Sequence, residues 1–359
     1  MALCIARNSA FTYKGKPVDV KQVAQELGVR YVLEGSVRKA GNRVRISGQL
    51  IDTTTGAHIW ADRFDSALDD IFELQDQVAS NVAGAIQPKL RQSEIERASR
   101  KPTANLTAYD LYLRALAQSY RFTEEGADEA VALARQALAI DPSYAPAAAV
   151  VGWCRVQQRA QGWGALSDEN IGEASRLARQ ALEAERDDAD TIGLAAWTLF
   201  YLAGEVAMAA ALDRALALNG NAALAWLARG IIHASRNQPE AAIAAVERAR
   251  RLSPFDPYSA FYAVTIAIAH LAARRFEQAI EWADRALQEQ PRMVQTMRVK
   301  IVALAHLGRL DEARAELGRV LAIDHELTIA GFRAYGRSSA PEVLELYVTG
   351  LRLAGLPER

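Results

Sequence analysis

Cysteine, histidine and closely spaced acidic residues are the side chains of this sequence that could hold a metal or carry catalysis. Cys4 and Cys154 are far apart and form no CxxC or Cys/His spacing, so buried thiols in a reducing compartment are a better interpretation than zinc ligands. The five histidines are scattered, and none stands at ligand spacing from a cysteine or a second histidine. The pattern predicts no metal site.

Two acidic groups are the alternatives for metal binding, namely Asp69-Asp70 and Asp187-Asp188 with Asp190. Both stand where we expect a helix to begin, and a carboxylate at that position accepts hydrogen bonds from free backbone amides. Helix capping is therefore the favoured interpretation of both groups.

The sequence contains no motif that binds a nucleotide or builds a hydrolase site, since GxxxxGK[ST], GxGxxG, GxSxG and HExxH are all absent. Tyr13-Lys14-Gly15-Lys16 has lysines beside a glycine, but one glycine cannot supply the successive backbone amides that enclose a phosphate. We expect no catalytic residue and no cofactor in this chain.

Charge and hydropathy argue against nucleic acid and membrane as partners. The 359 residues carry 42 Lys and Arg against 43 Asp and Glu, for a net charge of -1, so no global basic field attracts nucleic acid. No run of about 18 uncharged apolar residues is present, and residues 1–11 lack the apolar core of a signal peptide. We expect a cytoplasmic protein without a membrane span.

Residues 1–66 have the pattern of a small α/β domain. Residues 3–6 form a short apolar run suited to a strand, and Asp19 can cap a helix that runs to Glu26 and is closed by Gly28. Three strands follow at residues 30–39, 43–52 and 57–64, and the turns between them indicate an antiparallel meander.

Residues 67–105 read as a long amphipathic helix followed by a linker, with apolar residues at three- and four-residue spacing up to about residue 90. The helix is predicted over residues 67–99, and Pro102 marks the boundary after it. Acidic residues are interleaved with the basic ones at its end, which favours a solvated linker over a phosphate-binding patch; the basic residues are Arg91, Arg97, Arg100 and Lys101.

Residues 222–254 contain a helix, a turn at Arg236-Asn237-Gln238 and a second helix. Small residues stand where two helices of a hairpin would cross closely, and a proline ends the second helix. The positions of Trp226, Gly230, Ala242, Ala249 and Pro254 resemble the signature of a tetratricopeptide (TPR) repeat. A single hairpin of this kind cannot bury its apolar face, so stacked copies are expected.

The repeat can be followed through the second-helix alanine of each hairpin, and three of the five intervals are 34 residues, the TPR period; the positions are Ala137, Ala181, Ala215, Ala249, Ala286 and then Val320. An insertion around Gln161-Gly162-Trp163-Gly164 lengthens the first interval. The sequence therefore predicts a mainly α protein. Its TPR-type α-solenoid has about six hairpins at residues 106–325, capping helices at 326–359 and a small α/β domain in front.

The α/β segment carries the closest likeness to a known family. Residues 5–65, including LEGSVRKAGNRVRISGQLID and GAHIWADRFD, resemble the C-terminal part of a TolB-like domain. In bacterial proteins this domain stands beside TPR arrays, often with a class III adenylate/guanylate cyclase domain further N-terminal and otherwise with a winged-helix domain. The resemblance implies a regulatory or scaffolding part of a signalling protein.

The family's domain normally begins with an apolar strand, a Leu-Pro-Phe-like turn and a helix, and this sequence has neither the strand nor the helix. We therefore expect an N-terminally truncated α/β domain with an open strand edge, unless another element covers that edge. An open edge favours pairing with a second chain, so self-association there is one expected interaction.

The TPR resemblance also implies a binding groove along the concave face, lined by fixed positions of each first helix. Most of the side chains at these positions are apolar, which favours an apolar helix or extended segment as ligand; the residues are Trp197, Leu224, Leu227, Ile231, Phe261, Val264, Ile268, Leu271, Arg298 and His306. The alternative is that a tightly wound solenoid buries these residues against its own helices or cap.

Three functions are compatible with these patterns. The first is a non-catalytic protein-interaction module of a bacterial signalling protein. The second is the regulatory part of a class III adenylate cyclase, which converts ATP to cyclic AMP, with its catalytic domain outside this chain. The third is the sensor part of a winged-helix transcription regulator. The sequence favours the first for this polypeptide.

Overall fold

A computed structural model describes residues 13, 19–41, 43–67, 71–101, 106–164, 166–185, 188–204, 208–253, 256–336 and 339–359. The strand expected at residues 3–6, the lysines beside Gly15, the Asp69-Asp70 pair, Asp187, Pro102 and Pro254 lie outside these residues. The chain forms two compact units, Met1–Glu94 and Ile95–Arg359, which are taken separately.

Helix α2 (Val20–Leu27) comes first among the described helices of the first unit, and its ends have the residues that the sequence indicates. The Asp19 carboxylate accepts a hydrogen bond from the backbone amide of Lys21 at 2.8 Å. Gly28 ends the helix with φ of 64°, a left-handed conformation that favours glycine. Both predicted caps are confirmed.

Three antiparallel strands follow in the order β1 (Tyr31–Ala40), β2 (Arg43–Asp52) and β3 (Ala57–Ala67). Leu33, Leu50 and Trp60 are paired across the sheet. Leu50, in the central strand, is 3% exposed, whereas Leu33, in the outer strand β1, is 52% exposed. The predicted meander is confirmed, and among the described residues β1 pairs only with β2.

Helix α3 (Ile71–Arg100) extends from the first unit into the second. Within the first unit, the Tyr31 hydroxyl of β1 donates to the Glu94 carboxylate at 2.5 Å. Within the second, Lys101 lies 2.7 Å and Arg97 3.6 Å from the buried Asp110 carboxylate. The prediction that Arg97 and Lys101 belong to a solvated linker is therefore wrong, because a buried carboxylate draws both cations onto the solenoid.

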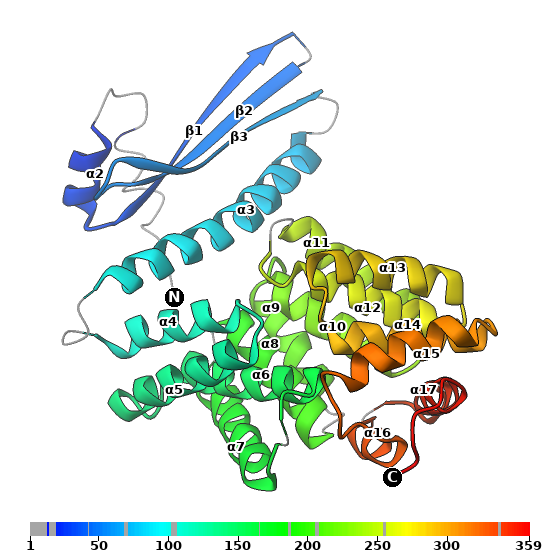
Figure 1. Ribbon diagram of the computed structural model, residues 1–359. Coiled ribbons are helices and arrows are strands. Elements are labelled where there is room, and N and C mark those ends of the chain that lie inside the picture. The colour runs from blue at the N-terminus through cyan, green and yellow to red at the C-terminus, as the bar shows by residue number, and fades with distance from the viewer. Residues whose placement is uncertain are drawn as a thin grey trace. The chain divides into compact units, whose positions relative to one another are not determined.

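In the part of the second unit that the structure describes, the helices pair into six hairpins. Figure 1 shows these helices in chain order from cyan to orange. Within each hairpin the second helix returns antiparallel to the first, as a short connection requires. The pairs are α4 (Ala108–Ser119) with α5 (Glu124–Ile140), α6 (Ala145–Gln161) with α7 (Asp168–Ala184), α8 (Ala189–Thr198) with α9 (Ala209–Leu218), α10 (Ala223–Ser235) with α11 (Pro239–Leu252), α12 (Ser259–Ala272) with α13 (Phe276–Glu289), and α14 (Val294–His306) with α15 (Leu310–Leu321).

The hairpin α10–α11 shows why the small residues of the repeat are needed. A Cβ at Gly230 would lie 2.6 Å from Val246 Cγ2, so the two helices are too close for a larger residue. Ala242 and Ala249 are fully buried, as the repeat pattern predicts. Trp226 is only half-buried, because its indole N–H donates to the Gly220 carbonyl at 2.9 Å in the preceding turn.

The third hairpin, α8 with α9, contains an irregular turn. Asp188 caps α8 by accepting from the Asp190 amide at 3.1 Å, as predicted for capping rather than metal binding. Helix α8 then continues as a π-helical turn, η2 (Leu199–Ala203), which ends at Gly204 with φ of 71°. The wider turn places Phe200 and Leu202 in the core.

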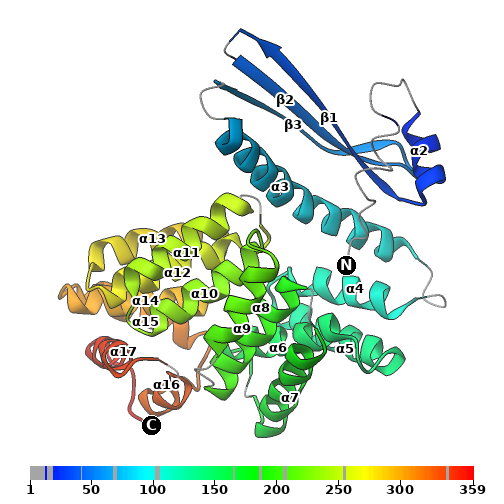
Figure 2. The ribbon, with the colours of Figure 1, turned by 180° about the vertical axis from the view of Figure 1, so that it is seen from behind.

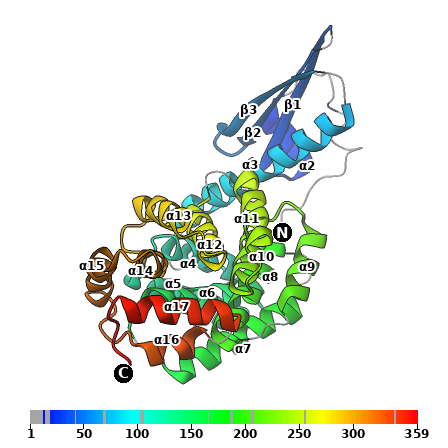
Figure 3. The same cartoon turned by 90° about the vertical axis from the view of Figure 1, so that its right-hand side faces the viewer.

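Helices α16 (Ile329–Tyr335) and α17 (Pro341–Leu353) follow the last hairpin, and α17 lies against α14 (Figure 3). A Cβ at Gly350 of α17 would lie 2.9 Å from Val302 Cα of α14, so this contact is made backbone to backbone. The Ala340 amide, just before α17, donates to the Ser235 carbonyl of α10 at 2.7 Å. Together these contacts hold the C-terminal helices on the solenoid.

The first helices of five hairpins pack against one another in succession and close on themselves. Helix α6 contacts α8, α8 contacts α10, α10 contacts α12, α12 contacts α14, and α14 contacts α6 again. In Figure 2, α6 lies near the middle of this unit. We call α6, α8, α10, α12 and α14 the helix ring. A solenoid that closes in this way buries its concave side.

Candidate functional site

The ten residues predicted to line a concave groove lie in the interior of the helix ring. Nine of them are buried, namely Trp197, Leu224, Leu227, Ile231, Phe261, Val264, Ile268, Leu271 and Arg298, and the tenth, His306, is half-buried. An exposed apolar groove is not found at these positions. Their burial agrees with the alternative interpretation, in which the solenoid's own helices and cap cover these residues.

An aromatic cluster explains why the concave side closes. The rings of Trp153 from α6 and Trp197 from α8 have centroids 4.5 Å apart, and Trp153 lies 5.3 Å from Phe261 of α12. Trp153 has no exposed surface. Each such ring removes about 150–250 Å² from water, so apolar burial across the ring favours the closed state over an open groove.

His306, the groove residue that keeps some exposure, is held by the C-terminal helices. Its imidazole stacks on Phe276 with ring centroids 5.1 Å apart, and its Nε2 lies 3.0 Å from the Leu346 carbonyl of α17. The histidine therefore joins the last hairpin to the capping helix.

Polar contacts between the second and sixth hairpins complete the ring. Arg298 Nη2 donates to the Ala160 carbonyl at 2.7 Å, and the Val294 amide donates to Gln161 Oε1 at 2.8 Å. Arg298 is 3% exposed, and its guanidinium also lies 5.8 Å from the centroid of Phe332. Because the carbonyls at a helix C-terminus carry partial negative charge, this buried cation stabilises the end of α6.

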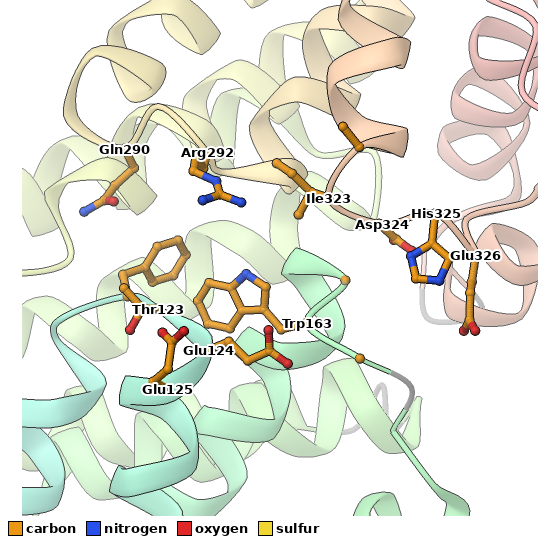
Figure 4. Close-up of a pocket in the computed structure, with 14 residues that line it drawn as sticks. Thr123, Glu124, Glu125, Trp163, Gln290, Arg292, Ile323, Asp324, His325 and Glu326 are labelled. Atoms are coloured by element: carbon orange, nitrogen blue, oxygen red, sulfur yellow. The ribbon is translucent and has the colours of Figure 1, made fainter.

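A cavity of about 530 Å³ lies next to the contacts that join the second and sixth hairpins, and we call it the closure pocket (Figure 4). Its lining comes from four separate places in the sequence. These are the start of α5 (residues 122–125), the loop after α6 (162–164), and the connections on both sides of the last hairpin (290, 292 and 322–326). The volume lies within the range of about 300–1,000 Å³ that is typical of ligand pockets.

The loop after α6 forms part of the lining of the closure pocket. Gly162 ends α6 with φ of 66°, and a Cβ at this position would lie 2.5 Å from Cβ and Cγ of Asp324. Only glycine fits both the conformation and the contact. Trp163 follows and is half-buried, and its ring lies 5.4 Å from that of Phe122. The pocket thus has an aromatic wall.

The charged groups of the closure pocket are mostly acidic. Glu124, Glu125, Asp324 and Glu326 face one guanidinium, that of Arg292, and one imidazole, that of His325. In Figure 4 the carboxylates of Glu124 and Glu125 lie on the same side as Trp163, and Arg292 lies across the space from them. Among the described residues none of the four carboxylates forms an ion pair, whereas Glu173, for example, is paired with Arg135.

The lining of the closure pocket has groups that can bind a ligand. Among the residues that the structure describes, no group of three or more His, Cys, Asp or Glu side chains is placed to hold a metal ion. The closure pocket combines an aromatic wall with carboxylates, which is a surface for a side chain that has an apolar stem and a positive end.

None of the helices in the described part of the chain combines the length and hydropathy needed to cross a bilayer.

Sequence reasoning identified the insertion at Gln161-Gly162-Trp163-Gly164 but not its role. Two glycines around a tryptophan inside a repeat array are the local signal, because a large aromatic residue in a loop needs a surface to pack on. In the sequence, residues 322–326 lie at the boundary predicted between the last hairpin and the capping helices. Nothing local connects these two segments, which meet only when the ring closes.

Comparison with known proteins agrees with the repeat architecture. A family model described as "Tetratricopeptide repeat" matches residues 209–257 and 264–326, which span α9 to α11 and most of α12 to α15. Human IFIT1, solved as a dimer with m7Gppp-AAAA, has a similar fold with a TM-score of 0.53 and 12% identity, covering 80% of this chain and 66% of IFIT1. At this identity the likeness shows the fold alone.

Two further proteins are similar over part of their length. A protein of Rhizobium meliloti (strain 1021) named "Putative adenylate cyclase 3" is 41% identical over 181 residues, which are 50% of this chain and 31% of that protein. A chain of the APC/C hetero-tetramer Cut9-Hcn1 has a TM-score of 0.49 and 15% identity, covering 72% of this chain and 48% of that one. This chain therefore spans about a third of the curated relative, and its second unit is a TPR-like solenoid.

Proposed function

We propose that this chain is a non-catalytic protein-interaction and regulatory module of a bacterial signalling protein, and that a protein or peptide partner binds at the closure pocket of its TPR solenoid. The observation that carries the proposal is the position of that pocket. The concave side is filled by the aromatic cluster around Trp153, whereas the closure pocket is open and has a half-buried tryptophan in its wall. Partly buried aromatic side chains are typical anchors of protein interfaces.

Selection of ligands from a random peptide library, with the purified chain immobilised, tests the proposal. Peptides that bind should be made synthetically and titrated by calorimetry. We expect Trp163→Ala to weaken their binding by about tenfold or more, since truncation of a central aromatic anchor costs about 2 kcal/mol.

Trp282→Ala is the matched control, because Trp282 lies on α13, outside the closure pocket, where it packs under Arg285 at 4.4 Å. This variant should bind the selected peptides as the wild-type chain does. Selection of no peptide, or equal weakening by the two substitutions, would contradict binding at the closure pocket.

A second function is favoured by the 41% identity to the protein named as an adenylate cyclase. In this proposal the chain is the regulatory C-terminal part of a class III cyclase, and the TolB-like resemblance of residues 5–65 belongs to the same arrangement. The solenoid would then bind and regulate a catalytic domain that is not in this sequence.

Reading the genomic DNA upstream of Met1 in the same frame separates the two functions. Cyclase sequence there would support the second, and a nearby in-frame stop codon would count against it. The purified chain with ATP and metal should form no cyclic AMP, and turnover that disappears on a substitution within residues 1–359 would contradict the non-catalytic assignment.

A further inference from the structure

We infer that the closure pocket selects a cationic side chain, an arginine or a lysine, of the partner. The inference rests on the proposed function and specifies the chemistry of the partner residue. In this arrangement the aliphatic stem lies against the indole of Trp163, and the positive end lies among the carboxylates of Glu124, Glu125 and Asp324.

The charge balance of the closure pocket supports a cationic ligand. Four carboxylates face a single guanidinium, and none of the four has an ion-pair partner among the described residues. Elsewhere on the solenoid, carboxylates such as Glu240 and Glu345 are paired with arginines. Carboxylates that line a cavity without such partners attract an incoming cation and repel an anion.

Two of the carboxylates lie close to the loop that carries Trp163. A Cβ at Gly164 would lie 3.7 Å from Glu124 Oε1, and one at Gly162 would lie 2.5 Å from Asp324 Oδ2. The loop that carries Trp163 therefore has a carboxylate near each end. A guanidinium over the ring can be attracted by the indole face and by both carboxylates.

Other occupants fit the lining less well. A phosphate or nucleic acid would meet four carboxylates and one exposed arginine, Arg292, so like charges would oppose it. An apolar helix would need to cover the same carboxylates without neutralising them, which is costly. A side chain with an apolar stem and a positive end satisfies both parts of the pocket.

A pair of short peptides tests the inference directly. The probe is acetyl-Leu-Arg-Leu-amide, and its neutral isostere contains citrulline in place of arginine. Binding is followed by NMR through the indole N–H of Trp163, which is assigned by its loss in Trp163→Phe. We expect the arginine peptide to bind about tenfold more tightly than the citrulline peptide and to weaken as salt is added.

Glu124→Gln with Glu125→Gln should remove the preference for arginine. Glu129→Gln with Glu183→Gln changes the net charge equally at exposed positions outside the pocket and should keep it. Circular dichroism checks that both double variants are folded. The role of Glu124 and Glu125 would be contradicted if their double variant kept the preference for arginine, or if the Glu129 and Glu183 double variant lost it.

The outcomes separate this inference from the proposed function. Equal binding of the arginine and citrulline peptides, preference for an acidic peptide or an oligonucleotide, or no shift of the Trp163 signal up to about 10 mM peptide overturns the cation preference. Library peptides that bind through Trp163 without a basic residue would leave the proposed function standing and remove only the inference.

Discussion

Arg298 donates a hydrogen bond of 2.7 Å to the carbonyl oxygen of Ala160, a residue 138 positions earlier in the chain. The two residues lie on α14 and α6, the helices that meet where the ring closes. The contact joins the sixth hairpin to the second and removes the guanidinium from water. It therefore turns an array of neighbouring repeats into a ring with a buried interior.

Arg298→Ala should lower the free energy of unfolding of the solenoid by about 2 kcal/mol or more, because a hydrogen bond to a charged group is lost and the Ala160 carbonyl stays buried. Urea unfolding followed by tryptophan fluorescence measures this, since five of the six tryptophans lie beyond residue 105. Arg285→Ala removes an exposed pair with Glu281 and should change stability by less than about 0.5 kcal/mol. Equal effects of the two substitutions would argue against a buried closing contact.

Gly162→Ala and Gly164→Ala separate backbone strain from crowding at the closure pocket. Both glycines have positive φ, of 66° and 73°, so each alanine costs about 1 kcal/mol of backbone strain. Only the Cβ at residue 162 would collide with Asp324, which adds about 1–3 kcal/mol. Thermal unfolding should therefore show the larger loss for Gly162→Ala, and the reverse order would mean that the two segments do not approach as closely as described.

The local part of this fold could be predicted from the sequence, and the closure could not. The three strands, the caps at Asp19 and Gly28 and the crossing at Gly230 depend on neighbouring residues and their periodicity. The sequence leaves Arg298 either in an open groove or in a buried interior, because repeat position alone does not show how tightly the solenoid winds. Its true surroundings depend on small helix-to-helix rotations that accumulate over several hairpins.

The closure pocket could not be predicted from the sequence either, because its walls come from hairpins that are far apart in the chain. Glycine and tryptophan at residues 162–164 indicated a loop with an aromatic residue, but its partner Asp324 belongs to a connection that the repeat pattern treats as ordinary. The interpretation of the acidic group at Asp188 as a helix cap was confirmed, because capping needs only adjacent residues.

Asp110→Asn tests the buried ion cluster at the start of the solenoid. Burial alone would raise the pKa of Asp110, but hydrogen bonds from Lys101 and Thr107 outweigh it and hold the pKa below its ordinary value of 3.8. The carboxylate therefore contributes stability that is complete above that value and is lost as the pH falls through the lower folded pKa. At pH 7 we expect the variant to be about 3 kcal/mol less stable.

The difference between Asp110→Asn and the wild-type chain should become smaller in unfolding curves recorded at successively lower pH, below 3.8. A difference that is constant with pH would show that the loss comes from packing and that the charge of Asp110 contributes nothing.

Cys154 should react with alkylating reagents only when the ring opens. Burial raises the pKa of this thiol to about 12, and the residue has no exposed surface, so neither thiolate nor access is available in the folded chain. In a Cys4→Ser background, iodoacetamide at pH 8 should label the protein slowly without denaturant and rapidly in urea. Rapid labelling of the folded chain would mean that α6 is open to solvent.

The central claim is that the solenoid closes on itself and so forms the closure pocket. Spin labels on cysteines at positions 125 and 326, both exposed on the rim of the pocket, measure it directly by pulsed electron paramagnetic resonance in a Cys4→Ser, Cys154→Ala background. We predict a single narrow distribution of short distances in the wild-type ring, broadened in Arg298→Ala. A broad distribution of long distances in the otherwise unchanged chain would contradict the closed ring.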